Sequence, residues 1–109
     1  MENKIKVYIE KYPNEIINMF NKLRELIFEV NENVEEKMWA NLPTYYLGDS
    51  FVRLIPFKDH INIEAKTIIA YLEELKDFEI TPKGMLKIFI NQEIPVKTLM
   101  KIFVDTLKD

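Results

Sequence analysis

The sequence predicts an α+β fold, an antiparallel sheet with helices packed on one of its faces. Apolar residues follow helical spacing over residues 5–30, the spacing changes to two over residues 37–64, and helical spacing returns from residue 68 and again from residue 99. Short strands that follow one another closely pair antiparallel, and the apolar stripes of the helices need a sheet face to cover. The expected order of elements is ααβββαβα.

Two helices are expected at the amino-terminal end. The first has an apolar face made of Ile5, Tyr8, Ile9 and Tyr12. Pro13 should end it and begin the second, because the N–H that proline lacks is not needed in a first turn. The second helix keeps its apolar stripe for more than four turns, through Ile16, Phe20, Leu23, Ile27 and Val30. Asn31 and Asn33 are suitable residues to end it.

Alternation of period two predicts the strands that follow. Residues 37–42 alternate as one strand that places Trp39 and Asn41 on the same face, and the pattern resumes after Pro43. Tyr45 and Tyr46 then follow, and one ring should face inward and the other outward. Gly48-Asp49 suits a tight hairpin turn.

The next two strands have clearly separated faces. In residues 51–57, one face takes Phe51, Arg53, Ile55 and Phe57, and Pro56 marks a strand end or an edge. After a turn at Lys58-Asp59, alternation places His60, Asn62 and Glu64 opposite Ile61 and Ile63. The strand before them could present Arg53 beside this polar face.

The carboxyl-terminal third returns to helices around one strand. Thr67 is the expected N-cap of a helix whose stripe is Ile68, Ile69, Leu72 and Leu75. Pro82-Lys83-Gly84 is a turn before a strand over residues 85–90. Pro95 should begin the last helix, whose core residues are Leu99, Ile102, Phe103 and Thr106.

Size and composition indicate a single domain over residues 1–109. Apolar residues make up 48% of the chain and charged residues 30%, which is ordinary for a globular protein. We expect a cytoplasmic protein without a membrane partner, because there is no apolar run long enough to cross a bilayer, no signal peptide and no cysteine. The net charge is −3, and the acidic excess lies within residues 1–36, so a nucleic-acid partner is not expected.

Several separated segments together resemble one protein family. They are Tyr8-Ile9, Tyr12-Pro13, residues 23–27, Glu35-Glu36, residues 39–45, residues 57–61, Lys83-Gly84 and Ile94-Pro95. In this order they resemble the YdhG-like family, small bacterial proteins of the superfamily that groups YdhG, YjbR and the bacterial frataxin CyaY. The resemblance implies a curved antiparallel sheet backed by helices. Some relatives are described as frataxin-like iron chaperones, so the resemblance also implies iron, weakly bound, as the cofactor to expect.

The segment over residues 39–61 is the predicted ligand face. It holds the only Trp and the only His of the chain, and we assign ligand binding to Trp39, Tyr45, Lys58 and His60. An aromatic floor beside a cation and an imidazole could hold a small anion or an aromatic ligand. The alternative is structural, with Trp39 filling a gap in the sheet and His60 capping a turn.

Four acidic residues near the end of the second helix are candidates for a metal site. They are Glu29, Glu32, Glu35 and Glu36, and hard cations favour such oxygen ligands. We assign metal contact to Glu32, Glu35 and Glu36. The alternative is a solvated surface, because the spacing is not that of an EF-hand.

An enzyme is not expected. Ser50 is the only serine and lies in a turn without an elbow motif, and Gly48 and Gly84 are the only glycines, so no phosphate-binding loop is present. The leading hypothesis is a non-enzymatic protein that binds a small molecule or a metal ion. The alternative is an interaction module, which uses the open sheet surface for a protein partner or a homodimer.

Overall fold

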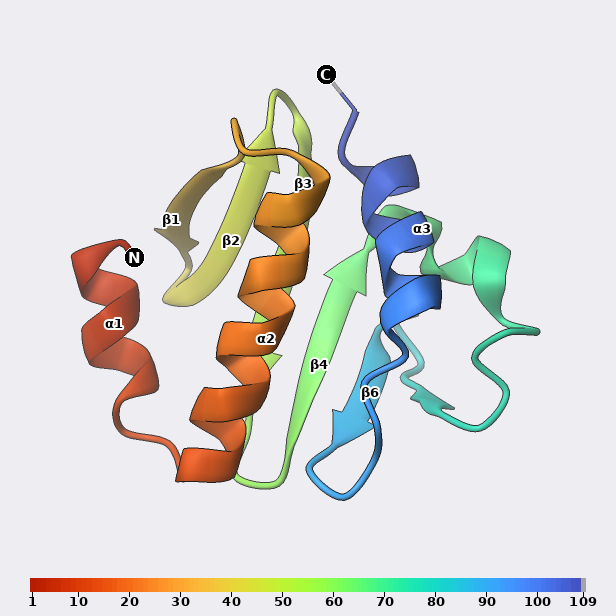
Figure 1. Cartoon of the computed structure of the whole chain (residues 1–109), viewed down its shortest axis with the longest axis horizontal. Helices are drawn as coiled ribbons and strands as arrows, with labels where there is room; N and C mark the ends of the chain where they lie inside the picture. The colour runs from red at the N-terminus through yellow and green to blue at the C-terminus, as the bar shows by residue number, and fades with distance from the viewer. Residues whose placement is uncertain (109) are drawn as a thin grey trace.

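A computed structural model describes residues 1–108 and confirms the α+β class. The helices are α1 (Asn3–Ile9), α2 (Asn14–Val30) and α3 (Val96–Thr106), with a 3₁₀ helix η1 (Lys66–Tyr71). The strands are β1 (Glu35–Trp39), β2 (Leu42–Leu47), β3 (Ser50–Pro56), β4 (His60–Ala65), β5 (Glu79–Ile80) and β6 (Leu86–Phe89). They form one antiparallel sheet in the order β1-β2-β3-β4-β6-β5, and α2 and α3 cover one face of it (Figure 1).

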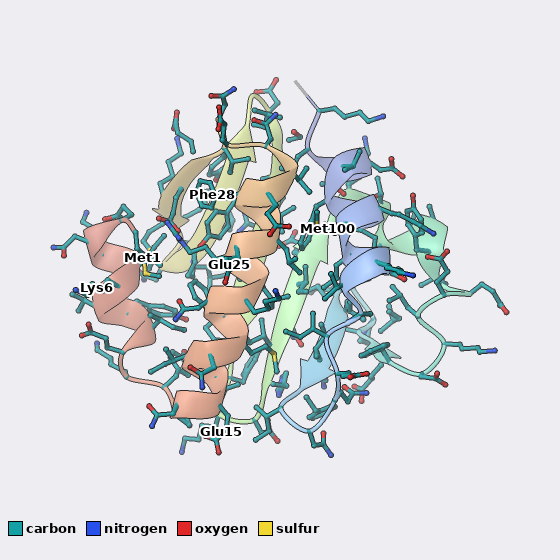
Figure 2. All side chains as sticks on the ribbon, in the orientation of Figure 1. Met1, Lys6, Glu15, Glu25, Phe28 and Met100 are labelled. Carbon is teal, nitrogen blue, oxygen red and sulfur yellow. The ribbon has the colours of Figure 1, made fainter. Side chains whose placement is uncertain are left out.

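The apolar stripes of the helices form one side of the core, as predicted. On α2, Ile16, Phe20, Leu23 and Ile27 are fully buried. On α3, the four predicted core residues Leu99, Ile102, Phe103 and Thr106 are all buried. Charged side chains such as Lys6, Glu15 and Glu25, labelled in Figure 2, remain exposed to solvent. The amphipathic pattern therefore orients α2 and α3 on the sheet.

The sheet supplies the other side of the core by strict alternation. Val52 and Leu54 of β3 and Ile61 and Ile63 of β4 are fully buried under the helices. Their neighbours Ile55 and Asn62 pair with each other on the opposite face. The predicted faces of these two strands are confirmed, and β3 ends at Pro56 because proline cannot donate to the next ladder position.

The first hairpin differs from the predicted single strand over residues 37–42. The chain reverses at Ala40 and Asn41, whose φ angles are +49° and +64°, so β1 and β2 are two strands. Two left-handed residues in succession suit the tight turn of a two-residue hairpin. Asn41 consequently lies in the turn rather than beside Trp39 on a strand.

The order of elements also differs from the predicted one. Four strands precede the third helical segment instead of three, and two strands, β5 and β6, follow it instead of one. The segment itself is the short 3₁₀ helix η1 followed by turns. Its N-cap residue is Ala65 and not Thr67. Thr67 instead donates its hydroxyl proton across to the Ile102 carbonyl of α3, at 3.0 Å, so it ties η1 to α3 rather than capping η1.

Candidate functional site

The face of the sheet away from α2 and α3 carries large aromatic and cationic side chains. Residues directly opposite each other on paired strands share a face. Lys37, Thr44, Arg53 and Glu64 are paired in this way from β1 to β4, so they form one row of side chains on this face. We call this side the open face. Its larger side chains are Trp39, Tyr46, Phe51, Arg53, His60 and Phe89.

Arg53 lies at the centre of the open face and is held by its neighbours. Its guanidinium carbon lies 4.1 Å from the centre of the Trp39 ring and 4.4 Å from that of Phe51. Its Nε donates to Thr44 Oγ1 at 3.0 Å, and its Nη1 donates to Glu64 Oε1 at 2.7 Å. Arg53 is buried, whereas 52% of Trp39 is exposed. The fixed cation therefore supports an indole whose other side faces solvent.

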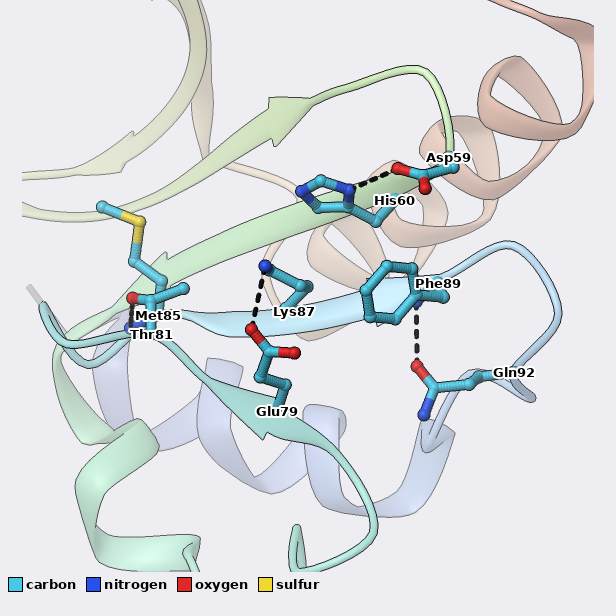
Figure 3. A network of polar contacts seen from close by, with 8 residues as sticks. All are labelled: Asp59, His60, Glu79, Thr81, Met85, Lys87, Phe89 and Gln92. Carbon is cyan, nitrogen blue, oxygen red and sulfur yellow. Dashed lines mark hydrogen bonds and ion pairs between the residues drawn. The ribbon is translucent and has the colours of Figure 1, made fainter.

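A second cluster surrounds His60 at the start of β4. The imidazole stacks on Phe57 with 4.4 Å between ring centres and an interplanar angle of 12°, and it lies 5.3 Å from Phe89. Its Nδ1 lies 2.7 Å from Asp59 Oδ1, and this hydrogen bond lowers the pKa of Asp59 (Figure 3). One ring nitrogen is thus engaged in a hydrogen bond, and Phe57 and Phe89 both pack against the imidazole.

Strand β6 is fixed beside this cluster by side chains on its flanks. Lys87 Nζ forms an ion pair with Glu79 Oε2 at 2.9 Å, and the backbone N–H of Phe89 donates to Gln92 Oε1 at 2.9 Å (Figure 3). These contacts attach the short strand β5 and the turn after β6. They also hold Phe89 against His60.

A cleft of about 710 Å³ lies at the end of the sheet where the chain leaves β4. Four segments form its walls: the β2–β3 turn with Phe51, the end of β4 with the start of η1, the Lys83-Gly84 turn, and the end of α3. We call it the end cleft. Phe51 and Glu64 belong to both the end cleft and the open face, so the two surfaces are continuous.

Hydroxyl groups hold the walls of the end cleft together. Thr67 Oγ1 and Thr106 Oγ1 lie 2.7 Å apart, which joins η1 to α3. Ser50 Oγ accepts a hydrogen bond from the backbone N–H of Lys108 at 3.1 Å, which joins the start of β3 to the segment after α3. These hydrogen bonds therefore join three of the four walls of the end cleft.

The four residues predicted for the ligand face do not all share one surface. Trp39 and His60 both lie on the open face, but they stand on β1 and β4, separated by roughly 14 Å of sheet. Lys58 is exposed in the turn before His60. Tyr45 lies on the other face, fully buried against Phe28 of α2, and burial raises the pKa of its hydroxyl. Tyr46 is the tyrosine on the open face.

The three residues predicted for metal contact are also separated. Glu32 is exposed between α2 and β1, and Glu35 and Glu36 are successive strand residues that point to opposite faces. Glu36 is already bound by Arg24, with Nε–Oε2 at 2.5 Å. Within residues 1–108, no three acidic or histidine side chains are grouped closely enough to hold a metal ion. Iron binding therefore stays a prediction, and the described residues offer no group of ligands arranged to hold the ion.

Sequence reasoning did not identify the residues of the end cleft. Alternation placed Phe51 and Glu64 on one side of the sheet, but Lys66, Lys83 and Lys108 stand in separate segments that meet only through the tertiary fold. The turn residues Lys83-Gly84 were the only local signal, and they indicated a turn rather than a site.

Comparison with protein-family models, with curated proteins and with solved structures finds no match for the chain. Membership of the YdhG-like family therefore stays a prediction. In the part of the chain that the structure describes, every helix is too short or too polar to span a membrane.

Proposed function

We propose that the protein is a non-enzymatic binding protein that takes a small organic ligand in the end cleft. The observation that carries this proposal is the cleft itself, whose volume of about 710 Å³ lies within the range of small-molecule sites. Phe51 and Ile69 give its lining an apolar part, and the exposed side chains of Asp49, Lys66 and Lys83 give it charged groups.

The positions of the reactive side chains support binding rather than catalysis. Ser50 Oγ donates to the Leu47 carbonyl at 2.7 Å and accepts from Lys108, so its hydroxyl is used in structure. His60 stands at the opposite end of β4 from the end cleft and is enclosed by Phe57 and Phe89. A nucleophile and its base need to be within hydrogen-bond reach, and these two are not.

Backbone NMR with a library of small organic fragments tests this proposal. Fragments that bind should shift the amide signals of the four cleft segments, residues 49–51, 64–69, 83–84 and 105–108. Ile69→Ala should weaken these fragments, because 70% of the Ile69 side chain is exposed at the cleft. Val7→Ala is the matched control, because Val7 is an exposed apolar residue of α1. Fragments that shift only amides outside the four segments would refute the proposal.

A second candidate function is self-association through the open face, with a second copy of the chain as the partner. Trp39 and Phe57 are exposed there, and Trp and Arg are residue types that dominate binding energy at interfaces. The charges of the face pair within it: Lys37 with Glu35, Arg53 with Glu64, and Lys87 with Glu79. Two such neutral faces can approach each other without like-charge repulsion, which favours a second copy over a highly charged partner.

A further inference from the structure

Three lysines from three different segments line the end cleft. Lys66 begins η1, Lys83 lies in the turn before β6, and Lys108 follows α3. Each is exposed, and none forms an ion pair with another residue of the described chain 1–108. Three ammonium groups are therefore available to a ligand, in a protein whose net charge is −3.

Two of the acidic residues that line the same cleft already have partners within the protein. Glu64 forms an ion pair with Arg53 at 2.7 Å, so its charge is compensated on the open face. Asp105 accepts a hydrogen bond from the Tyr71 hydroxyl. Asp49 lies exposed in the β2–β3 turn. With Glu64 compensated, the cations of the cleft outnumber its uncompensated carboxylates.

An apolar surface lies directly beside the lysines. Ile69 is the most exposed large apolar side chain described, at 70%, and its Cγ2 lies next to the backbone of Gly84. A Cβ added at Gly84 would lie 3.9 Å from that Cγ2, which is an ordinary van der Waals contact, so the Lys83-Gly84 turn packs beside the isoleucine. Phe51 adds an aromatic ring on the side toward the open face.

We infer that the end cleft selects small organic anions, in which a carboxylate or phosphate group faces the lysines and an apolar part lies on Ile69 and Phe51. This inference rests on the proposed binding role of the cleft. The ammonium groups of Lys66, Lys83 and Lys108 supply both charge and hydrogen-bond donors to the anionic group. Burial of the apolar part contributes the remaining affinity.

Four probes of one chain length separate charge from hydrophobicity: hexanoate, hexyl phosphate, hexanol and hexylammonium. Titration by NMR should show that both anions bind the cleft segments at least about fivefold more tightly than hexanol, and that hexylammonium binds no better than hexanol. Raising the salt concentration should weaken the anions and leave hexanol unchanged, because exposed charges are screened.

Paired lysine variants complete the test. Lys66→Gln with Lys83→Gln should lower the affinity for hexanoate about fivefold without changing that for hexanol. Lys22→Gln with Lys97→Gln changes the net charge equally at exposed sites away from the cleft and should have no effect. Equal binding of hexanoate and hexylammonium, or unchanged hexanoate affinity in the cleft variant, would overturn the anion inference while the cleft remains a binding site. If none of the four probes shifts the cleft amides, the proposed function fails as well.

Discussion

Ala40 has a backbone conformation that is unfavourable for an alanine. Its φ is +49°, in the left-handed region, where the Cβ atom approaches the following carbonyl. Ala40→Gly removes this strain, and we expect it to raise the free energy of unfolding by roughly 0.5–1 kcal/mol, after the greater freedom of glycine in the unfolded chain is counted. Thermal unfolding should show a midpoint higher by a few degrees.

The control for this substitution is Ala70→Gly. Ala70 is an exposed alanine in η1, where the backbone is right-handed, so glycine should lower the stability there by roughly 0.5–1 kcal/mol. Opposite signs at the two positions would assign the effect to the backbone angle. A lower midpoint for Ala40→Gly would contradict the strain at the β1–β2 turn.

At the scale of elements, Glu36 connects β1 to both amino-terminal helices. Arg24 of α2 donates to it through Nε at 2.5 Å and through Nη2 at 3.1 Å, and the Glu2 backbone N–H before α1 donates to Oε1 at 2.7 Å. Burial alone would raise the pKa of Glu36, but the Arg24 and Glu2 hydrogen bonds outweigh it and hold the pKa below its usual 4.5. The Glu36 side chain is only 7% exposed, so these contacts are well shielded from water.

Glu36→Gln should therefore destabilise the protein in a pH-dependent manner. A carboxyl whose folded pKa is depressed contributes stability above its unfolded pKa, and this contribution is lost as the pH falls through the folded value. We expect a loss of roughly 2–3 kcal/mol at pH 7, measured by urea unfolding, that shrinks when the pH is lowered below the usual glutamate pKa.

Glu35→Gln is the matched control for this element. Glu35 precedes Glu36 on β1, but its side chain is 71% exposed and pairs only with Lys37, at 3.2 Å. Its loss should change the stability by less than about 1 kcal/mol at either pH. A similar loss for both variants, or a Glu36→Gln deficit that is the same in acid and at neutral pH, would show that the Arg24 pair does not anchor α2 to β1.

At the scale of the whole molecule, the sequence predicted features that depend on local pattern, such as which residues share a face of a strand. Alternation placed His60 and Glu64 on one face and suggested Arg53 beside them, and the Arg53–Glu64 ion pair confirms that arrangement. It led us to assign Tyr45 to the ligand face, yet Tyr45 is buried on the other face and Tyr46 lies on the open face. The face depends on where the chain turns, and Ala40-Asn41 lacks the glycine that marks such a hairpin.

The end cleft could not be predicted for a different reason. Its walls come from segments that are far apart in sequence, such as the β2–β3 turn and the end of α3, which meet through the contact between Ser50 and Lys108. Residues that converge only through tertiary packing leave no periodic signal in one chain. The metal site was suggested by the closeness in sequence of Glu29, Glu32, Glu35 and Glu36. Glu35 and Glu36, however, are neighbours on a strand and point to opposite faces.

The second candidate function makes a prediction about the assembly state. If the open face binds a second copy, light scattering should give a mass that rises above 13.1 kDa as the concentration increases. Trp39→Ala should reverse this rise, because it removes the exposed ring held over Arg53, whereas Val104→Ala, an exposed apolar change on α3, should not. The emission of Trp39 should shift to shorter wavelength with concentration, because association removes the indole from water. A constant mass of 13.1 kDa with unchanged emission would refute self-association and leave the end cleft as the binding site.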